Sequence, residues 1–316
     1  MQSNTHFIRV PEDSFGGAPG QARLSRGAVV GLRSQSPLLL CNSLYVSVLH
    51  EGGPVVGLRN VSYDVSGGTA TIIINRPERR NSLDKATYAE IQASLDEANG
   101  DPKVGVVVLT GSGEQAFASG ADLKTVNTLE LDQYRDYLET NAATRTKIYG
   151  LDKPVIARVN GACLGGATSL ATSCDIVVAV DTARFGQTEI NVGLVGGIDH
   201  FWTLGKALVS EMMLTGRVLS AQEALQVGLI NRVVPREELD AAVDEYAQKI
   251  LSKSPYGIAL TKRILAFSLQ ASGFSQARAF QFEMVLQAFQ SDDRREGIDA
   301  FIERRPARYQ GRADGS

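Results

Sequence analysis

Histidine and cysteine are scarce in this sequence, which contains three of each. They are His6, His50, His200, Cys41, Cys163 and Cys174. None of them stands at the C-x-x-C or H-x-x-x-H spacing that metal sites often use, so a structural zinc site and a disulfide framework are both disfavoured. We therefore expect no bound metal and a reducing compartment. The expected location is cytoplasmic, or an organellar matrix if the N-terminal segment is a targeting sequence.

An unbroken apolar run of membrane-spanning length is also lacking. The longest candidate, residues 28–49, is interrupted by Arg33, Gln35 and Pro37, whereas a bilayer crossing needs about 20 consecutive apolar residues. Charge of one sign is lacking too, because 32 basic and 35 acidic residues leave a net charge of −3. Such a chain has no general electrostatic attraction for nucleic acid. We expect neither a membrane nor a nucleic acid among its partners.

The composition is that of a soluble globular protein, with 43% apolar and 21% charged residues among 316. Glycine is abundant: the sequence has 31, where an average usage of about 7% would give roughly 22. Turns and close backbone approaches are therefore expected to matter. Residues 1–58 show no sustained helical or strand period and are rich in Gly, Ser, Pro and Arg. We interpret them as a poorly ordered N-terminal extension.

The first predicted elements are a strand pair and an amphipathic helix. Strands over residues 61–65 and 69–75 flank a Ser-Gly-Gly turn, which is a hairpin signal. Asn81 or Ser82 can cap the helix that follows, and the Gly-Asp-Pro sequence at residues 100–102 ends it. Its apolar residues recur at the spacing of a single helix face.

Further along, strands alternate with helices. Near-continuous apolar runs at residues 104–109, 154–159 and 175–180 predict strands that are buried on both faces of a parallel sheet. After Pro235 the strand patterns cease, and helical patterns continue to Arg305. This order is typical of an α/β fold with a helical C-terminal region.

Two glycine-bearing turns each follow a predicted buried strand. They span residues 117–124, with the sequence FASGADLK, and residues 159–167, with the sequence VNGACLGGA. Small residues let the backbone approach a ligand, and the first N–H groups of a helix lack internal partners. Two such N–H groups converging on one oxygen would form an oxyanion hole. Taken singly, each segment can equally be an ordinary tight turn.

Together with a third segment, RFGQTEINVGL at residues 184–194, these turns resemble motifs of the crotonase superfamily, also called the enoyl-CoA hydratase/isomerase family. The resemblance runs from about Asn60 to Gln310. It rests on the ordered segments IINRPERRNSLD, FASGADLK, VNGACLGGATSLATSCDIVVA, RFGQTEINVGL, MMLTGRVLSAQEALQVGLINRVVP and EGIDAFIERRPARYQG.

The resemblance implies an α/β fold in which a spiral of ββα turns forms a core over residues 59–250. A C-terminal helical region, residues 251–316, would build a homotrimer or a hexamer made of two trimers. The implied substrate is an acyl-CoA thioester, and no separate cofactor is expected because coenzyme A is part of the substrate. Backbone N–H groups of Ala121 and Gly166 match the positions that hold the thioester oxygen as enolate charge develops on it.

Coenzyme A contacts are implied for a larger set of positions near the two turns and near the C-terminus. They are Arg79, Arg80, Ser82, Ser119, Asp122, Leu123, Leu164, Gly165, Phe301 and Arg304. The last two match positions that often come from the neighbouring subunit. Arginines suit phosphate groups, although solvated surface arginines would give the same pattern.

One departure from the family pattern decides the expected reaction. Family hydratases use two carboxylates to add water; here the second is Glu189, but the position of the first is Ser169. A serine hydroxyl is too weak an acid or base to replace a glutamate unaided. Glu189 alone can take a proton from the carbon next to the thioester and return it two carbons along. The resemblance therefore favours isomerisation of an enoyl-CoA by a single glutamate base.

Other residues could add a second function in the acyl pocket. His200 stands in Asp-His-Phe-Trp, where many relatives have a Gly-Thr-Gln-Arg-like run, while Tyr134, Tyr137 and Glu139 lie in the region that shapes the pocket in relatives. Structural or surface roles are the simpler interpretation of all four. A triad of Ser169, His200 and Asp199 is disfavoured, because adjacent Asp and His side chains cannot easily orient each other.

Alternatives to the isomerase therefore remain open. One is an enoyl-CoA hydratase, or an acyl-CoA hydrolase or lyase, that uses one glutamate plus His200 or a tyrosine. Another is a non-catalytic trimer that binds acyl-CoA.

Overall fold

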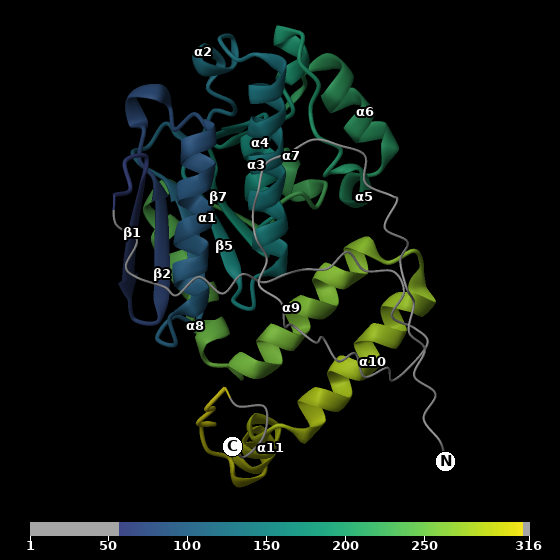
Figure 1. Cartoon of the computed structure of the whole chain (residues 1–316). Coiled ribbons are helices and arrows are strands. Elements are labelled where there is room, and N and C mark those ends of the chain that lie inside the picture. Colours follow the sequence, from purple (N-terminus) through teal and green to yellow (C-terminus); the bar gives the residue numbers. More distant parts are fainter. Residues whose placement is uncertain (1–56, 312–316) are drawn as a thin grey trace, which may run out of the picture. The chain divides into compact units, whose positions relative to one another are not determined.

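The structure is a computed structural model that describes residues 57–311 (Figure 1). The extension predicted for residues 1–58 lies outside the described residues, except for its last two positions.

A six-stranded sheet of strand order β1-β2-β3-β5-β7-β10 forms the centre of the described part. Its strands are β1 (Val61–Ser66), β2 (Thr69–Ile74), β3 (Val106–Gly111), β5 (Val155–Val159), β7 (Ile176–Val180) and β10 (Arg232–Val234). β1 and β2 form the expected antiparallel hairpin, and the remaining neighbours pair in parallel. Every residue of β3 is buried, which explains its continuous apolar run.

A second sheet contains four strands of three residues each, β4 (Ala116–Ala118), β6 (Ala162–Leu164), β8 (Arg184–Gly186) and β9 (Val218–Ser220). β4, β6 and β8 are parallel neighbours, whereas β9 pairs antiparallel with β8. Neither these short strands nor β10 are predicted by the sequence, because three residues are too few to display a period. Since β4, β6 and β8 are parallel, the segments that follow them emerge at the same edge of this sheet.

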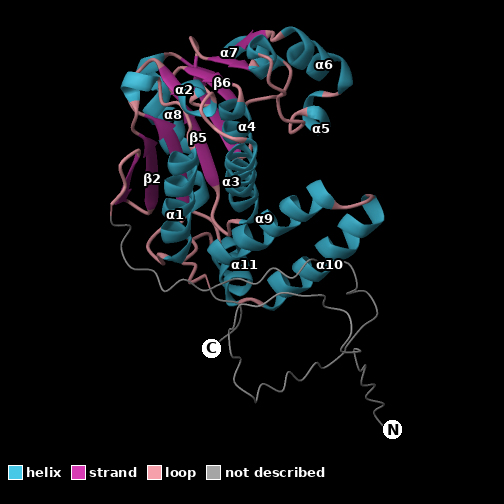
Figure 2. Ribbon diagram, turned by 45° about the horizontal axis from the view of Figure 1, so that its top comes forward, coloured by secondary structure: helices cyan, strands magenta, loops and turns pink. Residues whose placement is uncertain are grey.

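The helices of the described part include three 3-10 turns labelled η; most flank the sheets, whereas the last three along the chain form a separate group (Figure 2). They are η2 (Pro77–Arg79), α1 (Lys85–Gly100), α2 (Leu123–Val126), α3 (Leu131–Gly150), α4 (Gly166–Thr172), η3 (Glu189–Val192), α5 (Phe201–Leu204), α6 (Lys206–Thr215), α7 (Ala221–Gln226), η4 (Arg236–Glu238), α8 (Leu239–Leu251), α9 (Pro255–Gln270), α10 (Phe274–Gln290) and α11 (Asp292–Glu303). α1 packs beside α3 and contacts β1 and β2, while α8 contacts β3, β5 and β7.

Two predicted boundaries are wrong. α1 is capped by Asp84, whose side chain accepts from the N–H of Thr87 at 2.8 Å, and not by Asn81 or Ser82. The Asn81 amide instead donates to the carbonyl oxygen of Ala116 at 2.8 Å. β3 begins two residues later than predicted, because the N–H of Val104 closes a turn onto the carbonyl of Asp101.

The C-terminal helices stack on one another and on the core. Phe267 of α9 and Phe280 of α10 have ring centroids 4.2 Å apart. Lys262 of α9 is buried, and its ammonium group lies 2.7 Å from the carboxylate of Asp175, just before β7. This contact joins the helical region to the sheet. In residues 57–311 no helix has both the length and the apolar character needed to cross a bilayer.

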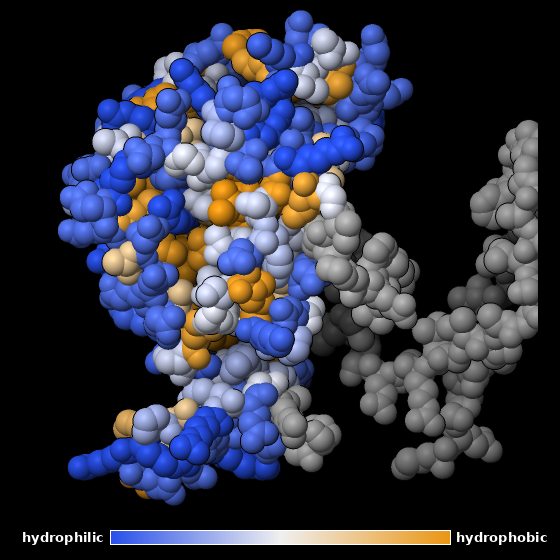
Figure 3. All heavy atoms as spheres, turned by 90° about the vertical axis from the view of Figure 1, so that its left-hand side faces the viewer, coloured by the Kyte–Doolittle hydropathy of each residue, from blue (hydrophilic) through white to orange (hydrophobic). Residues whose placement is uncertain are grey.

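The face of the molecule that carries β1 and β2 is mostly hydrophilic, with apolar areas broken up by polar residues (Figure 3). Large apolar side chains are exposed instead along α10 and α11. Phe274, Phe282, Phe289 and Phe301 are 78%, 60%, 62% and 85% exposed. An apolar surface of this kind is typical of an interface that is covered in an assembly.

Candidate active site

The two glycine-bearing turns lie against each other at the edge of the smaller sheet. Gly120 follows β4 and has a φ of 94°, and Gly165 follows β6 and has a φ of 57°. A Cβ at Gly120 would lie 2.8 Å from the carbonyl oxygen of Leu164, which no real side chain would tolerate. Both conformations favour glycine. The contact therefore requires glycine, and it brings the next residues of both turns, Ala121 and Gly166, to one place.

Hydrogen bonds hold the backbone on either side of these two residues. The N–H of Leu83 donates to the carbonyl of Gly120 at 2.8 Å, and the N–H of Asp122 donates to the carbonyl of Leu83 at 3.0 Å. The N–H of Gly165 donates to the carbonyl of Gly186 at 2.7 Å. By contrast, the N–H groups of Ala121 and Gly166 have no acceptor among the described residues. Two fixed, unused donors are thus available to a ligand.

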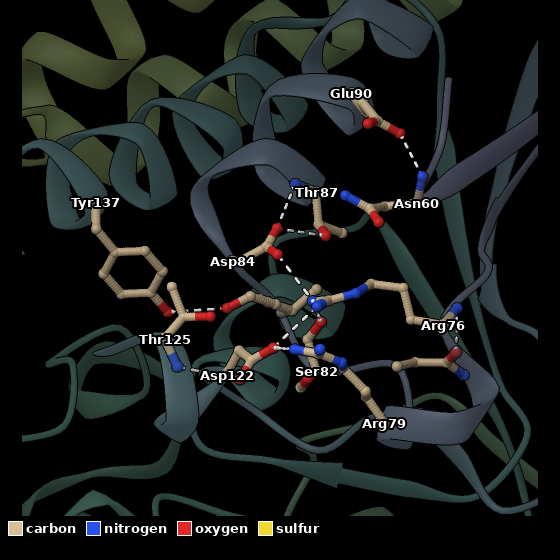
Figure 4. A network of polar contacts seen from close by, with 12 residues as sticks. Asn60, Arg76, Arg79, Ser82, Asp84, Thr87, Glu90, Asp122, Thr125 and Tyr137 are labelled. Carbon is tan, nitrogen blue, oxygen red and sulfur yellow. Dashed lines mark hydrogen bonds and ion pairs between the residues drawn. The ribbon is translucent and has the colours of Figure 1, made fainter. Parts of the chain in front are cut away.

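An ion cluster around the buried side chains of Asp122 and Arg76 holds the first turn in place (Figure 4). The carboxylate of Asp122 accepts from the guanidinium groups of Arg76 and Arg79, each at 2.8 Å. Arg76 also lies 3.1 Å from Asp84, the cap of α1, and donates to the carbonyl of Ser82 at 2.5 Å. Burial disfavours the charge on Asp122, but the hydrogen bonds outweigh burial and hold its pKa below the usual value.

Glu189 begins the 3-10 turn η3, three residues after β8, and its carboxylate faces the second turn. A Cβ at Gly165 would lie 3.2 Å from Oε1 of Glu189, and a Cβ at Gly196 would lie 3.0 Å from Oε2. Burial raises the pKa of Glu189, a hydrogen bond from its own N–H partly offsets this, and the charge of Asp199 raises it further. The carboxyl group is therefore closer to neutrality than an exposed glutamate.

Ser169 and His200 are both buried, at 1% and 2% exposure, and both contact the side-chain amide of Gln187. Burial lowers the pKa of His200, which favours the neutral imidazole. No hydrogen bond joins Ser169 to His200 within residues 57–311, and Asp199 lies 3.3 Å from Arg145 instead. The disfavoured triad is accordingly not formed.

Two of the candidate pocket residues on α3 lie together. Tyr137 is buried, stacks on the half-buried Tyr134 at 6.0 Å, and donates its hydroxyl to the carbonyl of Leu83 at 3.4 Å. Burial raises the pKa of Tyr137 beyond the range in which it could act as a base near neutrality. Glu139 is exposed to solvent.

Two further side chains near the second turn, those of Tyr88 and Asn141, were not singled out as candidates by the sequence analysis. A Cβ at Gly166 would lie 3.3 Å from the Tyr88 hydroxyl and 3.5 Å from the Asn141 amide nitrogen. Tyr88 is fully buried, yet its hydroxyl has no hydrogen-bond partner among the described residues. The available signal was a polar aromatic residue on the apolar face of α1. Gln187 was not singled out in the sequence analysis either, although the side-chain amide of Gln187 contacts Ser169 and His200, which were singled out there.

Most positions proposed to contact coenzyme A surround the first turn. Arg79, Ser82, Ser119, Asp122 and Leu123 lie there, while Leu164 and Gly165 belong to the second turn. Arg80 is exposed, and its guanidinium has no ion-pair partner in the described part of the chain.

Phe301 and Arg304 lie elsewhere, at the end of α11, which packs on α9 and α10. A single chain therefore does not bring these two residues to the site. A group of three or more metal-binding side chains is absent from residues 57–311.

Comparison with known proteins gives a consistent picture. The family model described as enoyl-CoA hydratase/isomerase matches residues 64–312. A short-chain-enoyl-CoA hydratase of Clostridium acetobutylicum is 36% identical over 255 residues, covering 78% of this chain and 96% of the relative. A mitochondrial enoyl-CoA hydratase of Pongo abelii is 37% identical over 243 residues, covering 75% of this chain and 82% of the relative.

Comparison with solved structures leads to proteins of the same kind. The crystal structure of an enoyl-CoA hydratase from Bacillus anthracis matches with a TM-score of 0.77 at 33% identity, covering 80% of this chain and 100% of that chain. The structure of an enoyl-CoA hydratase from Mycobacterium smegmatis matches with a TM-score of 0.76 at 30% identity, covering 80% and 99%.

Replacing Asp122 tests the ion cluster. We expect Asp122→Asn to lower the free energy of unfolding at neutral pH by about 2 kcal/mol, because the buried guanidinium group of Arg76 loses a charged acceptor. The folded-state pKa of Asp122 is lowered, so its contribution is present above the unfolded pKa of about 3.9 and is lost as pH falls through the folded value. Urea unfolding at neutral and acidic pH should therefore show that acidification lowers the free energy of unfolding less in the variant than in the wild type.

A matched control for this experiment is Asp136→Asn, which alters an exposed pair with Lys85. Exposed pairs contribute about 0–1 kcal/mol. Equal effects of the two substitutions would contradict the structural role of Asp122.

Tyr88→Phe tests whether the buried Tyr88 hydroxyl lacks a hydrogen-bond partner. Because this group is removed from water without gaining a partner, we expect its loss to raise the free energy of unfolding by about 1 kcal/mol. Urea unfolding measures the change. Tyr137→Phe removes a hydroxyl that does have an acceptor, and it should not be stabilising; a destabilised Tyr88→Phe would show that the hydroxyl is satisfied.

Proposed function

Because this chain belongs to the enoyl-CoA hydratase/isomerase family, we propose that it isomerises an enoyl-CoA by proton transfer, with Glu189 as the base. Membership also makes it an enzyme of that family with the crotonase fold, as the sequence predicted. The single observation that carries the proposal is the arrangement of one carboxylate, with a raised pKa, facing the second of two adjoining turns with unused N–H groups.

In the proposed reaction the thioester oxygen of a 3-enoyl-CoA accepts from the N–H groups of Ala121 and Gly166. The Glu189 carboxylate removes a proton from the carbon next to the thioester, and the electron pair moves onto the thioester oxygen as a dienolate. The same proton then returns to the carbon two positions along, giving the 2-enoyl-CoA with no atom gained or lost. A preorganised donor of this kind typically contributes about 3 kcal/mol to an anionic transition state.

Ser169 is the reason for preferring isomerisation to hydration. Water addition needs one group to activate water and another to supply a proton, and Ser169 offers no carboxylate for this. His200 does not replace it, because its neutral imidazole is buried and contacts Gln187. These observations also weigh against a hydrolase or lyase that relies on His200 or on Tyr137.

Hydration is the second candidate, since the similar proteins from Clostridium acetobutylicum and Pongo abelii are named enoyl-CoA hydratases. The absorbance of the conjugated enoyl-thioester separates the two reactions. Hydration of crotonyl-CoA removes this absorbance, whereas isomerisation of 3-hexenoyl-CoA creates it.

Coenzyme A would lie along the first turn. The free guanidinium of Arg80 supports phosphate binding there, whereas Arg79 and Asp122 already bind each other and would shape the turn. Phe301 and Arg304 could reach a coenzyme A only across a subunit interface.

Glu189→Gln is expected to abolish turnover with little loss of CoA-ester binding, because the amide keeps the shape of the carboxyl group but cannot take a proton. Stopped assays with 3-hexenoyl-CoA and binding of a saturated acyl-CoA measure the two effects. Wild-type activity should fall on acidification with a midpoint above the ordinary glutamate pKa of about 4.3. Near-normal turnover by the variant would refute the assignment.

Glu139→Gln serves as the control, since Glu139 is exposed on α3, and it should retain wild-type turnover. If the wild type binds CoA esters but turns over no enoyl-CoA, a non-catalytic acyl-CoA-binding protein is the better description.

We also propose that the chain assembles as a homotrimer, or as two such trimers, through its C-terminal helices. The exposed phenylalanines of α10 and α11 support this. Light scattering should give a mass that is a multiple of three chains, and Phe289→Asp should dissociate the assembly. A wild type that stays monomeric at micromolar concentration would contradict the proposal.

A further inference from the structure

The amide of Gln187 lies between the candidate base and two buried hydrogen-bond donors. Its oxygen accepts from the hydroxyl of Ser169 at 2.9 Å and from Nε2–H of His200 at 2.9 Å. Its NH2 group lies 3.1 Å from each carboxylate oxygen of Glu189. Gln187 is only 1% exposed, so water does not compete for these contacts.

The chemistry of the neighbours selects this orientation of the amide. Turned the other way, the amide oxygen would face the two carboxylate oxygens of Glu189 at 3.1 Å with no hydrogen atom between them. Buried groups that lack partners are costly. With the NH2 group on the Glu189 carboxylate, the amide oxygen faces Nε2 of His200 at 2.9 Å, so the imidazole carries its proton on Nε2. The Glu189 carboxylate therefore sets the direction in which the amide points, and Ser169 and His200 hold the amide oxygen in place.

We propose that Ser169 and His200 are positioning residues that act on Glu189 through the amide of Gln187. This inference rests on the proposed function, in which Glu189 is the base. It assigns a role to the serine that stands where family hydratases carry their first glutamate: its hydroxyl holds the amide that donates to the remaining carboxylate. A hydrogen bond to a carboxylate favours its charged form, so this relay from Ser169 and His200 through Gln187 limits the rise in the pKa of Glu189 that burial causes.

Other charges near Glu189 act independently of this relay. Asp199 raises the pKa of Glu189 through its charge, and Asp199 is itself paired with Arg145 of α3. The hydroxyls of Tyr88 on α1 and Tyr137 on α3 also lie within electrostatic range of Glu189. All four groups remain unchanged in the variants below, so they contribute equally to each measurement.

The first test is Gln187→Met, which keeps an unbranched side chain but removes the donor. We expect the pKa of Glu189 to rise by about one pH unit, the size expected for loss of a hydrogen bond to a charged group. The pKa is read from 13C-glutamate-labelled protein by NMR, with Glu189→Gln identifying the signal. The acid limb of kcat/KM for 3-hexenoyl-CoA should move to higher pH by the same amount, with KM little changed.

The second test separates the relay from direct effects. Ser169→Ala and His200→Phe should each shift the pKa of Glu189 upward, by less than Gln187→Met does. In the Gln187→Met background neither should shift it further, because both act only through the amide. A direct influence of His200 would persist in that background and would overturn the proposal.

The matched control is Ser173→Ala. Ser173 is another buried serine at the end of α4, and its hydroxyl donates to the backbone carbonyl of Ser169 at 2.7 Å without touching Gln187. It should leave the pKa of Glu189 unchanged. Thermal unfolding of every variant shows which of them retain the native fold.

The failures of the two proposals are distinguishable because the NMR titration needs no turnover. An unchanged pKa in Gln187→Met, with the fold retained, overturns the relay whatever the activity. A shifted pKa in a protein that processes no enoyl-CoA would support the relay and contradict the proposed function.

Discussion

The close approach of two backbone turns is the constraint on which the site depends. Gly120 lies against Leu164 and Gly165 so tightly that a Cβ would collide with a carbonyl oxygen. That approach is possible because β4 and β6 are parallel neighbours whose carboxyl ends meet at one edge. The N–H groups of Ala121 and Gly166 come together as a result, and the Asp122 ion cluster and the hydrogen bond from Gly165 to Gly186 hold the two turns in place.

Parallel pairing also explains why the base faces these turns. β8 is the next strand after β6 in the smaller sheet, so the segment that follows β8 emerges at the same edge and carries Gln187 and Glu189. Of the polar residues gathered there, Ser169, Gln187 and His200 are buried and Glu189 is half-buried, and most of them are satisfied by one another. The Tyr88 hydroxyl and one carboxylate oxygen of Asp199 have no hydrogen-bond partner among the described residues. Unsatisfied buried groups are costly to keep and are characteristic of sites that act on a ligand.

Elements with a clear period were predictable from the sequence. The hairpin over β1 and β2, the buried β3 and the amphipathic α1 follow from alternation, continuous apolar burial and helical spacing respectively. The cap of α1 was mispredicted, because the nearby Asn81 binds a distant carbonyl, and that contact leaves no local trace. The three-residue strands of the smaller sheet could not be predicted from the sequence either, because they are stabilised by pairing with segments far along the chain.

For function, the sequence by itself determined which groups are present: Glu189, a serine in place of a second carboxylate, and glycine at both turns. These are properties of single positions and short motifs, and they were enough to recognise the family. Only the tertiary structure decided how the groups combine. Ser169 and His200 are 18 and 13 residues from Gln187, and they meet its amide because α4, β8 and the start of α5 converge. The direction of that amide depends on all its neighbours at once, which no local pattern encodes.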